Sequence, residues 1–346
     1  MNKNKSSNLL RLIAFFLTGV ILVCTFGFTV DGWNQVVNDD NIQQPPQDNS
    51  ESSAELPEEP KEEPPQVFFN KLTGVETTEY LSNMAPTAFV IEKKAPCFGL
   101  YGAEIIVDIP TEQSNRLLCI RTDNENLWKI GSIAPTRGYI SNFASFFGSA
   151  LLSYGSDEII EQDSCTSRNV HDITTYCYSE YERYLYTNSE LINPLLTENE
   201  FDAILPYDFV NPEDLLTLET RANRISFEEC ELKYSDEKKA YLWFENRDQV
   251  RDLANGKSID FANCLILFAD SVIYDNADGC QMVMNTIGSS EGYYASLGGI
   301  TRIRWTSSLN GNMSFFNENG EPLIINRGNV YIRVLRSSTF NDFFVS

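Results

Sequence analysis

Histidine is almost absent from this chain, and so are the motifs that depend on it. The only histidine is His171, in the polar segment RNVHDITTY, where we expect an exposed residue. A single histidine excludes a multi-histidine zinc site and leaves any histidine-based catalysis to one residue. The sequence also contains no C-x-x-C pair and no P-loop. It therefore predicts no metal and no cofactor.

Basic residues are scarce as well. The 346 residues include 26 Lys and Arg against 49 Asp and Glu, a net charge of -23, which makes a general binder of nucleic acid or anionic lipid implausible. The imbalance is uneven: residues 67–220 hold 9 basic and 23 acidic residues, a net of -14, whereas 221–346 hold 13 and 16, a net of -3. This asymmetry predicts two folded domains, 67–220 and 221–346.

Charge is missing altogether from residues 12–30, which are dominated by Leu, Ile, Val and Phe. Nineteen helical residues span roughly the 30 Å hydrocarbon core of a bilayer, so residues 1–33 are predicted to form a cytoplasmic tail and a membrane anchor. Three basic residues precede the apolar run, which by the positive-inside rule places the remaining chain outside the cytoplasm. The alternative is cleavage and lipidation at Cys24, although Val23 is larger than the residue that such processing favours.

Residues 34–66 contain many Pro, Glu, Ser and Gln and hardly an aromatic. Such a composition cannot bury enough apolar surface to offset the entropy of ordering. The segment is predicted to be a disordered, acidic linker that holds the folded part away from the membrane.

Seven cysteines follow the apolar segment, and an odd number cannot pair completely. Cys119, Cys264 and Cys280 lie in apolar, strand-like runs, where cysteine behaves as a small buried hydrophobic residue. Free cysteines are therefore the main expectation. A single disulfide between Cys165 and Cys177 is the alternative.

The segment 67–220 is predicted to be an α/β domain. Residues 87–92, 103–110 and 115–121 read as strands, and Ile105, Val107 and Ile109 share the core face of the second. The following stretch reads as strand, helix and strand, with apolar residues at helical spacing from Ile140 onwards. This βαβ pattern predicts a partly parallel sheet.

Ligands of parallel sheets bind beyond the carboxyl ends of the strands, which here are 131–137 and 155–158. Arg137 would lie near the start of the helix, where the helix dipole disfavours a cation. It therefore needs a partner, either Glu104 or Asp108 in a structural pair, or an anionic ligand.

Acidic residues of the second loop are a further candidate site. Asp157 and Glu158, with Asp163, could supply paired carboxylates for glycoside cleavage, but acidic loop residues are common in a domain this acidic.

The segment 221–346 contains many short strand patterns separated by turn sequences such as SDEK, DNADG and LNGN. It is predicted to be a mainly antiparallel β domain, so that the whole chain is of the α+β class. In TRIRW, Arg302 and Arg304 share the face opposite Ile303 and Trp305, which indicates either a solvated strand face or a contact surface for an anion or polymer.

Several segments together resemble the YerB family of bacterial envelope lipoproteins, a two-domain family of unknown function. They include FVIEKKAPCFGLYGAEIIVDIP and WKIGSIAPTRGYISNFA in the first domain, and FANCLILFAD and FFNENGEPLIINRGNVYIRV in the second. Arg137 stands at the second arginine of the family's G-P-V-R-S-A-R type loop, and Ala134 at the first. Ser153, Tyr154 and Gly155 stand where the family has H-A-G, so much of the family's polar constellation is replaced.

These observations predict a membrane-anchored, extracytoplasmic binding or scaffold protein of the bacterial envelope. Its partners would be the membrane, through residues 12–30, and a polymer or protein of the cell envelope. The alternative is an envelope hydrolase acting on a cell-wall polymer, which would bring two or more titratable groups with shifted pKa values together in one cleft.

Overall fold

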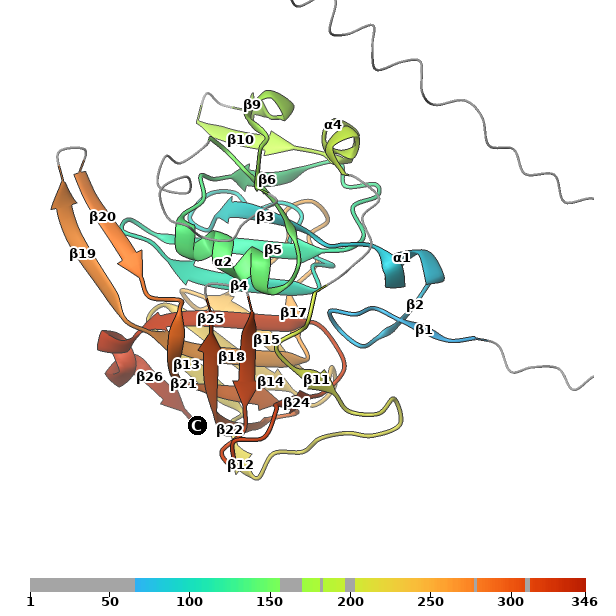
Figure 1. Cartoon of the computed structure of the whole chain (residues 1–346), viewed down its shortest axis with the longest axis vertical. Helices are drawn as coiled ribbons and strands as arrows, with labels where there is room; N and C mark the ends of the chain where they lie inside the picture. Colours follow the sequence, from blue (N-terminus) through green and yellow to red (C-terminus); the bar gives the residue numbers. More distant parts are fainter. Residues whose placement is uncertain (1–65, 156–169, 181–182, 197–202, 277–278, 309–311) are drawn as a thin grey trace, which may run out of the picture. The chain divides into compact units, whose positions relative to one another are not determined.

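The computed structural model describes residues 66–155, 170–180, 183–196, 203–276, 279–308 and 312–346, and this part of the chain is mostly β (Figure 1). The predicted anchor and nearly all of the predicted linker lie outside these residues. Within the described ranges, no helix is both long and apolar enough to cross a membrane.

A sheet of fourteen strands contains strands from both predicted domains (Figure 1). Its main path runs β12-β22-β21-β18-β25-β4-β5-β3-β6-β10-β9, with β23 beside β22, β7 beside β3, and β8 beside β7. The strands are β3 (Thr87–Glu92), β4 (Ile105–Pro110), β5 (Asn115–Arg121), β6 (Ile130–Ile133), β7 (Ala150–Ser153), β8 (Val170–Asp172), β9 (Tyr178–Glu180), β10 (Tyr184–Thr187), β12 (Thr220–Arg221), β18 (Asn263–Ala269), β21 (Gly288–Ser296), β22 (Gly299–Ser307), β23 (Met313–Phe316) and β25 (Val330–Arg336).

The two predicted domains meet inside this sheet, at the parallel pair β4 and β25. Four residues of each strand are in register, from Val330 opposite Ile105 to Arg333 opposite Asp108. β25 also pairs in parallel with β18 along seven residues. The last long strand of the chain therefore lies between the two halves and joins them.

A second sheet of six strands and three two-stranded sheets complete the β structure. The six are β13 (Arg224–Phe227), β14 (Cys230–Ser235), β15 (Ala240–Glu245), β16 (Asp248–Gln249), β17 (Asp260–Phe261) and β26 (Phe343–Val345). The pairs are β1 (Phe68–Phe69) with β2 (Glu76–Thr77), β11 (Asp208–Phe209) with β24 (Ile324–Ile325), and β19 (Ser271–Asn276) with β20 (Gly279–Met284).

The described helices are short. They are α1 (Glu79–Asn83), α2 (Gly138–Phe146), α4 (Ser189–Ile192) and the 3-10 helices η1 (Thr174–Tyr176), η2 (Asn193–Leu195) and η3 (Ser337–Asp342). α2 is the helix predicted from the apolar spacing, and its buried residues include Ile140 and Phe143. The three predicted strands of the first half also appear, as β3, β4 and β5.

The prediction that β6, α2 and β7 form a βαβ unit is wrong, because the two strands do not run in the same direction. β6 pairs antiparallel with β3 and β7 pairs parallel with it, so β6 and β7 run in opposite directions. They meet end to end, where the Tyr154 amide donates to the Ala134 carbonyl over 3.3 Å. The sheet is partly parallel, as predicted, but its parallel pairs are β3 with β7, β7 with β8, β18 with β25 and β25 with β4.

The central strands of the large sheet are buried on both faces. In β4, Ile105, Val107 and Ile109 face a core that α2 completes, as the alternation predicted. Ile106 faces a second core, to which Phe227 and Trp243 of the six-stranded sheet contribute. A charged residue on that second face of β4 is therefore covered by protein.

The cysteines of the described part are free, as mainly expected: Cys97, Cys119, Cys177, Cys230, Cys264 and Cys280. Cys165, the other half of the alternative disulfide, lies outside the described residues. Cys280 is exposed rather than buried, and His171 is exposed, as expected, but belongs to β8.

Candidate functional site

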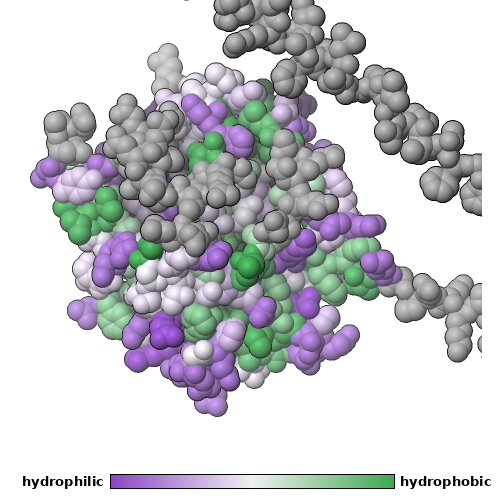
Figure 2. Space-filling view, viewed as in Figure 1, coloured by the Kyte–Doolittle hydropathy of each residue, from purple (hydrophilic) through white to green (hydrophobic). Residues whose placement is uncertain are grey.

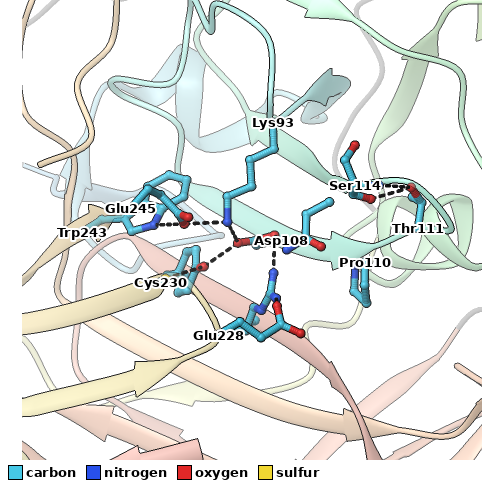
Figure 3. A network of polar contacts seen from close by, with 12 residues as sticks. Lys93, Asp108, Pro110, Thr111, Ser114, Glu228, Cys230, Trp243 and Glu245 are labelled. Atoms are coloured by element: carbon cyan, nitrogen blue, oxygen red, sulfur yellow. Dashed lines mark hydrogen bonds and ion pairs between the residues drawn. The ribbon is translucent and has the colours of Figure 1, made fainter. Parts of the chain in front are cut away.

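Asp108 is the centre of a buried polar network at the seam between the two halves (Figure 3). Its side chain is fully buried and accepts four hydrogen bonds. One oxygen receives Arg333 Nη1 at 2.6 Å and Asn115 Nδ2 at 3.0 Å. The other receives Lys93 Nζ at 2.6 Å and the Tyr331 hydroxyl at 2.8 Å. Both oxygens of the carboxylate are therefore fully engaged, which a buried charge requires.

Two further carboxylates extend the network outwards. Arg333 also donates through Nη2 to Glu228 at 2.5 Å, and Lys93 Nζ lies 2.5 Å from Glu245. Trp243 Nε1 donates to the same Glu245 oxygen at 2.8 Å. Two cations thus bridge one fully buried acid to two acids that are partly exposed.

The pKa values of Asp108, Lys93 and Arg333 are all shifted in the direction that favours their charged forms. Burial alone would raise the pKa of Asp108, but Arg333 and Lys93 outweigh it, and the pKa lies below its ordinary value. Burial likewise opposes the charged form of Lys93 and Arg333, yet Asp108 is the main reason that both of their pKa values are raised.

Local structure explains how these side chains converge. The parallel register places Arg333 of β25 directly opposite Asp108 of β4, and Lys93 follows the last residue of β3. Glu228 lies in the tight turn between β13 and β14 with a φ of 51°, which directs the turn towards the seam. Glu245 is the last residue of β15.

A cleft of about 720 Å³ opens above the network. Its walls come from the β4–β5 turn, the β13–β14 turn, the end of β15, the end of β25 and the β19–β20 hairpin. It is lined by Lys93, Lys94, Pro110, Thr111, Glu112, Gln113, Ser114, Asn115, Glu228, Glu229, Cys230, Glu245, Asn246, Ile273, Arg333 and Arg336.

Lys94 and Arg336 distinguish this cleft from a purely structural network. Unlike Lys93 and Arg333, neither forms an ion pair with an acid of the described residues, and the buried Nε of Arg336 has no hydrogen-bond partner there. Glu229, in the turn between β13 and β14, is exposed, and it also forms no ion pair with another described residue. The cleft thus offers a ligand both signs of charge.

The prediction that Arg137 pairs with Glu104 or Asp108 is wrong. Its Nη2 lies 2.5 Å from Glu112 of the β4–β5 turn, not near Glu104 or Asp108. Glu112 is close because β4 runs past the start of α2 and turns there, whereas Asp108 already has two cations. Burial alone would raise the pKa of Glu112, but the hydrogen bond and charge of Arg137, a backbone hydrogen bond and the charge of Arg116 together hold it below its ordinary value.

Glu104 and Ser153 lie apart from the cleft. Glu104 accepts hydrogen bonds from the Thr122 hydroxyl and from Asn70, and burial raises its pKa. Ser153 is fully buried at the end of β7, and its hydroxyl has no hydrogen-bond partner among the described residues. Asp157 and Glu158 lie outside the described residues.

Arg302 and Arg304 are exposed on β22, and Ile303 and Trp305 on its other face are buried. The predicted alternation is therefore correct. Neither arginine lines the cleft. Of the described residues that the sequence proposed for a site, Asp108 alone belongs to the network.

The sequence analysis did not identify Lys93, Glu228, Glu245 and Arg333 as site residues. A signal was present: Asp108 stands within IIVDIP and Arg333 within VYIRVL, each a charge inside an apolar strand. Two opposite charges in such positions indicate a buried pair. Within the ranges that the structure covers, no group of His, Cys, Asp and Glu is arranged to hold a metal ion.

Comparisons with known proteins support the resemblance read from the sequence. Residues 221–332 match the C-terminal domain of a family of proteins of unknown function, DUF3048. The fold is similar to the crystal structure of the YerB protein from Bacillus subtilis, with a TM-score of 0.67 and 19% identity over 81% of this chain and 99% of that chain. A comparison with curated proteins found no match. The fold thus resembles that of YerB, and residues 221–332 also match in sequence, in agreement with the predicted resemblance.

Proposed function

We propose that the protein is a membrane-anchored, extracytoplasmic binding protein of the bacterial envelope and that its ligand occupies the cleft above the Asp108 network. The proposed ligand is a fragment of the cell-wall polymer that carries both amine and carboxylate groups. The single observation that carries the proposal is the cleft lining, in which cations and an acid remain available beside a rigid set of ion pairs.

The lining suits such a ligand in detail. Lys94 and Arg336 can receive a carboxylate, and Glu229 can receive an amine. Gln113, Asn246 and other amides and hydroxyls of the cleft can bind the sugar and peptide groups between them. The volume is within the range of ordinary ligand sites, about 300 to 1,000 Å³.

Binding is favoured over the alternative, hydrolysis. Titratable groups do converge in the cleft, but a general acid or base needs a pKa near the working pH. The pKa of Asp108 is lowered and that of Lys93 is raised, so each shift moves away from neutrality. The letters G-x-S-x-G do occur at residues 288–292, but they lie inside β21 and not at the strand-to-helix turn that exposes a nucleophile.

The placement of the protein rests on its N-terminal sequence. The uncharged residues 12–30 would anchor the chain, and the acidic, proline-rich residues 34–66 would act as a spacer. A cleft held at a distance from the membrane on such a spacer is suited to reach a wall polymer.

Intact protoplasts that make the full-length chain test the proposal with a fluorescent disaccharide-peptide released from cell wall. We expect saturable binding to the protoplasts, and Arg336→Gln should weaken it by about tenfold, the loss of one charged hydrogen bond. Arg302→Gln is the matched control, because Arg302 is exposed and remote from the cleft.

The two parts of the proposal, the outward orientation of the chain and the cleft as the ligand site, can be contradicted independently. Binding that appears only after the protoplasts are lysed would contradict the outward orientation and leave the cleft assignment standing. Equal binding by the parent and Arg336→Gln chains, or no binding in either preparation, would contradict the cleft assignment.

A further inference from the structure

The β19–β20 hairpin is one of three two-stranded sheets in the described residues. Its two strands pair with each other along six residues and with no other strand of the described residues. Figure 1 shows it extending from the large sheet as a separate arm. A lone two-stranded hairpin is at best marginally stable in water, and three strands with an apolar face are usually needed.

One face of this arm is apolar and exposed. Val272 lies directly opposite Val283, and Tyr274 follows on the same face, because paired residues and residues two apart share a face. Their exposed fractions are 65%, 43% and 43%. Figure 2 shows the corresponding apolar patch on the arm. On the opposite face Met282 is buried in the core, whereas its partner Ile273 is 49% exposed.

The charges of the arm have one sign. Asp270 precedes β19 and Asp275 lies within it, both exposed, and the hairpin has no Lys or Arg. Asp275 lies on the face opposite Val272 and Tyr274, since it is an odd number of residues from each. A strand beside the arm would therefore meet apolar side chains on one face, and Ile273 together with the Asp275 carboxylate on the other.

A second copy of the chain is a poor occupant of these edges. Two identical hairpins would bring acid against acid, in a protein whose net charge is -23. Charged residues on an open strand are a known means of preventing such self-pairing. The same acids favour a partner of opposite charge.

We propose that the β19–β20 hairpin docks an extended segment of another protein in which apolar and basic residues alternate. The segment adds a third strand along β19, which among the described strands pairs only with β20, with its apolar side chains beside Val272 and Tyr274 and its basic side chains on the face of Asp275. Main-chain hydrogen bonds supply affinity, and the alternation supplies specificity. This site is separate from the ligand assignment of the cleft, although Ile273 of the arm lines the cleft wall.

The test uses the full-length chain and a synthetic seven-residue peptide that alternates valine and lysine, with binding followed by fluorescence anisotropy. We expect saturable binding that Val272→Thr and Asp275→Asn each weaken by at least about fivefold. Threonine retains the preference for strand, so the first variant should keep the hairpin. Val75→Thr is the matched control, because Val75 is exposed elsewhere, in the loop before β2.

Two modified peptides separate strand addition from nonspecific attraction. One version is methylated on the backbone nitrogens of its odd-numbered residues and the other on those of its even-numbered residues. Each keeps every side chain but can no longer donate hydrogen bonds from one of its two edges, so one of the two peptides should lose binding. A peptide with glutamate in place of lysine should not bind.

Equal binding by both methylated peptides would overturn strand addition, and binding by the glutamate peptide would overturn the charge argument. Absence of binding by the lysine peptide would overturn the proposal. A concentration-dependent dimer that Val272→Thr abolishes would also overturn it, because a second copy would then be the occupant.

Discussion

Arg333 and Arg302 lie in one row across the same face of the large sheet, and their surroundings differ completely. Arg302 pairs with Tyr293, Tyr293 with Ile266, and Ile266 with Arg333, which itself lies opposite Asp108. Three strand spacings, roughly 14 Å, separate the two arginines. Arg333 is 1% exposed and ion-paired, whereas Arg302 is exposed.

The cover over the sheet accounts for this difference. Above Arg333 lies Phe227 of the six-stranded sheet, whose ring centre is 5.4 Å from the guanidinium. Because this cover excludes water from the guanidinium, the charge of Arg333 is stabilised by Asp108 and Glu228 instead. On β22 the cover reaches Ile300, which is buried on the same face, but not Arg302, which stays in water. Position across the sheet, and not residue type, therefore decides whether an arginine is a structural ion or a solvated surface charge.

The largest effect is expected from removing the buried arginine. Arg333→Met leaves Asp108 buried with fewer partners and should lower the free energy of unfolding by about 3 to 5 kcal/mol at pH 7. Denaturant unfolding of the full chain measures this loss. If Arg333→Met and Arg302→Met unfold at the same denaturant concentration, the comparison is wrong.

A smaller, pH-dependent effect is expected from Asp108→Asn. The folded-state pKa of Asp108 is below the ordinary value of about 3.9, so its stabilisation is present above that pH and is lost as the pH falls through the folded pKa. A penalty of about 3 kcal/mol at pH 7 should therefore shrink in unfolding experiments near pH 3.

Glu104 on the same strand provides the control of opposite sign. Burial raises its folded-state pKa, so the parent chain gains stability from this group as the pH falls. The free energy of unfolding of Glu104→Gln should therefore fall relative to that of the parent at low pH.

A penalty for Asp108→Asn that stays constant from pH 7 to pH 3 would show that Asp108 is not held ionised by its neighbours.

The smallest effect is expected at the exposed end of the row. Arg302→Gln and Arg304→Gln should each change the free energy of unfolding by less than about 0.5 kcal/mol, as is usual for surface positions. A loss above 2 kcal/mol in the same unfolding assay would mean that β22 is covered by something in the folded protein.

The strands of the first half and α2 could be predicted because local patterns determine them. Alternation in residues 105–110 and helical spacing around Ile140 and Phe143 depend only on nearby residues. The partner of Arg137 could not be predicted in this way. Glu112 reaches it through the turn after β4, and that geometry exists only once the strands are paired.

The sequence by itself determined strands such as β3, β4 and β5, which residues of β4 and β22 share a face, and the resemblance to YerB. Those properties follow from residue order over a few positions. Only the tertiary structure decided that β25 enters between β18 and β4, so that Arg333 meets Asp108 across a separation of 225 residues. The register of non-local strands depends on packing summed over both faces of the sheet, and no short stretch of sequence contains that sum.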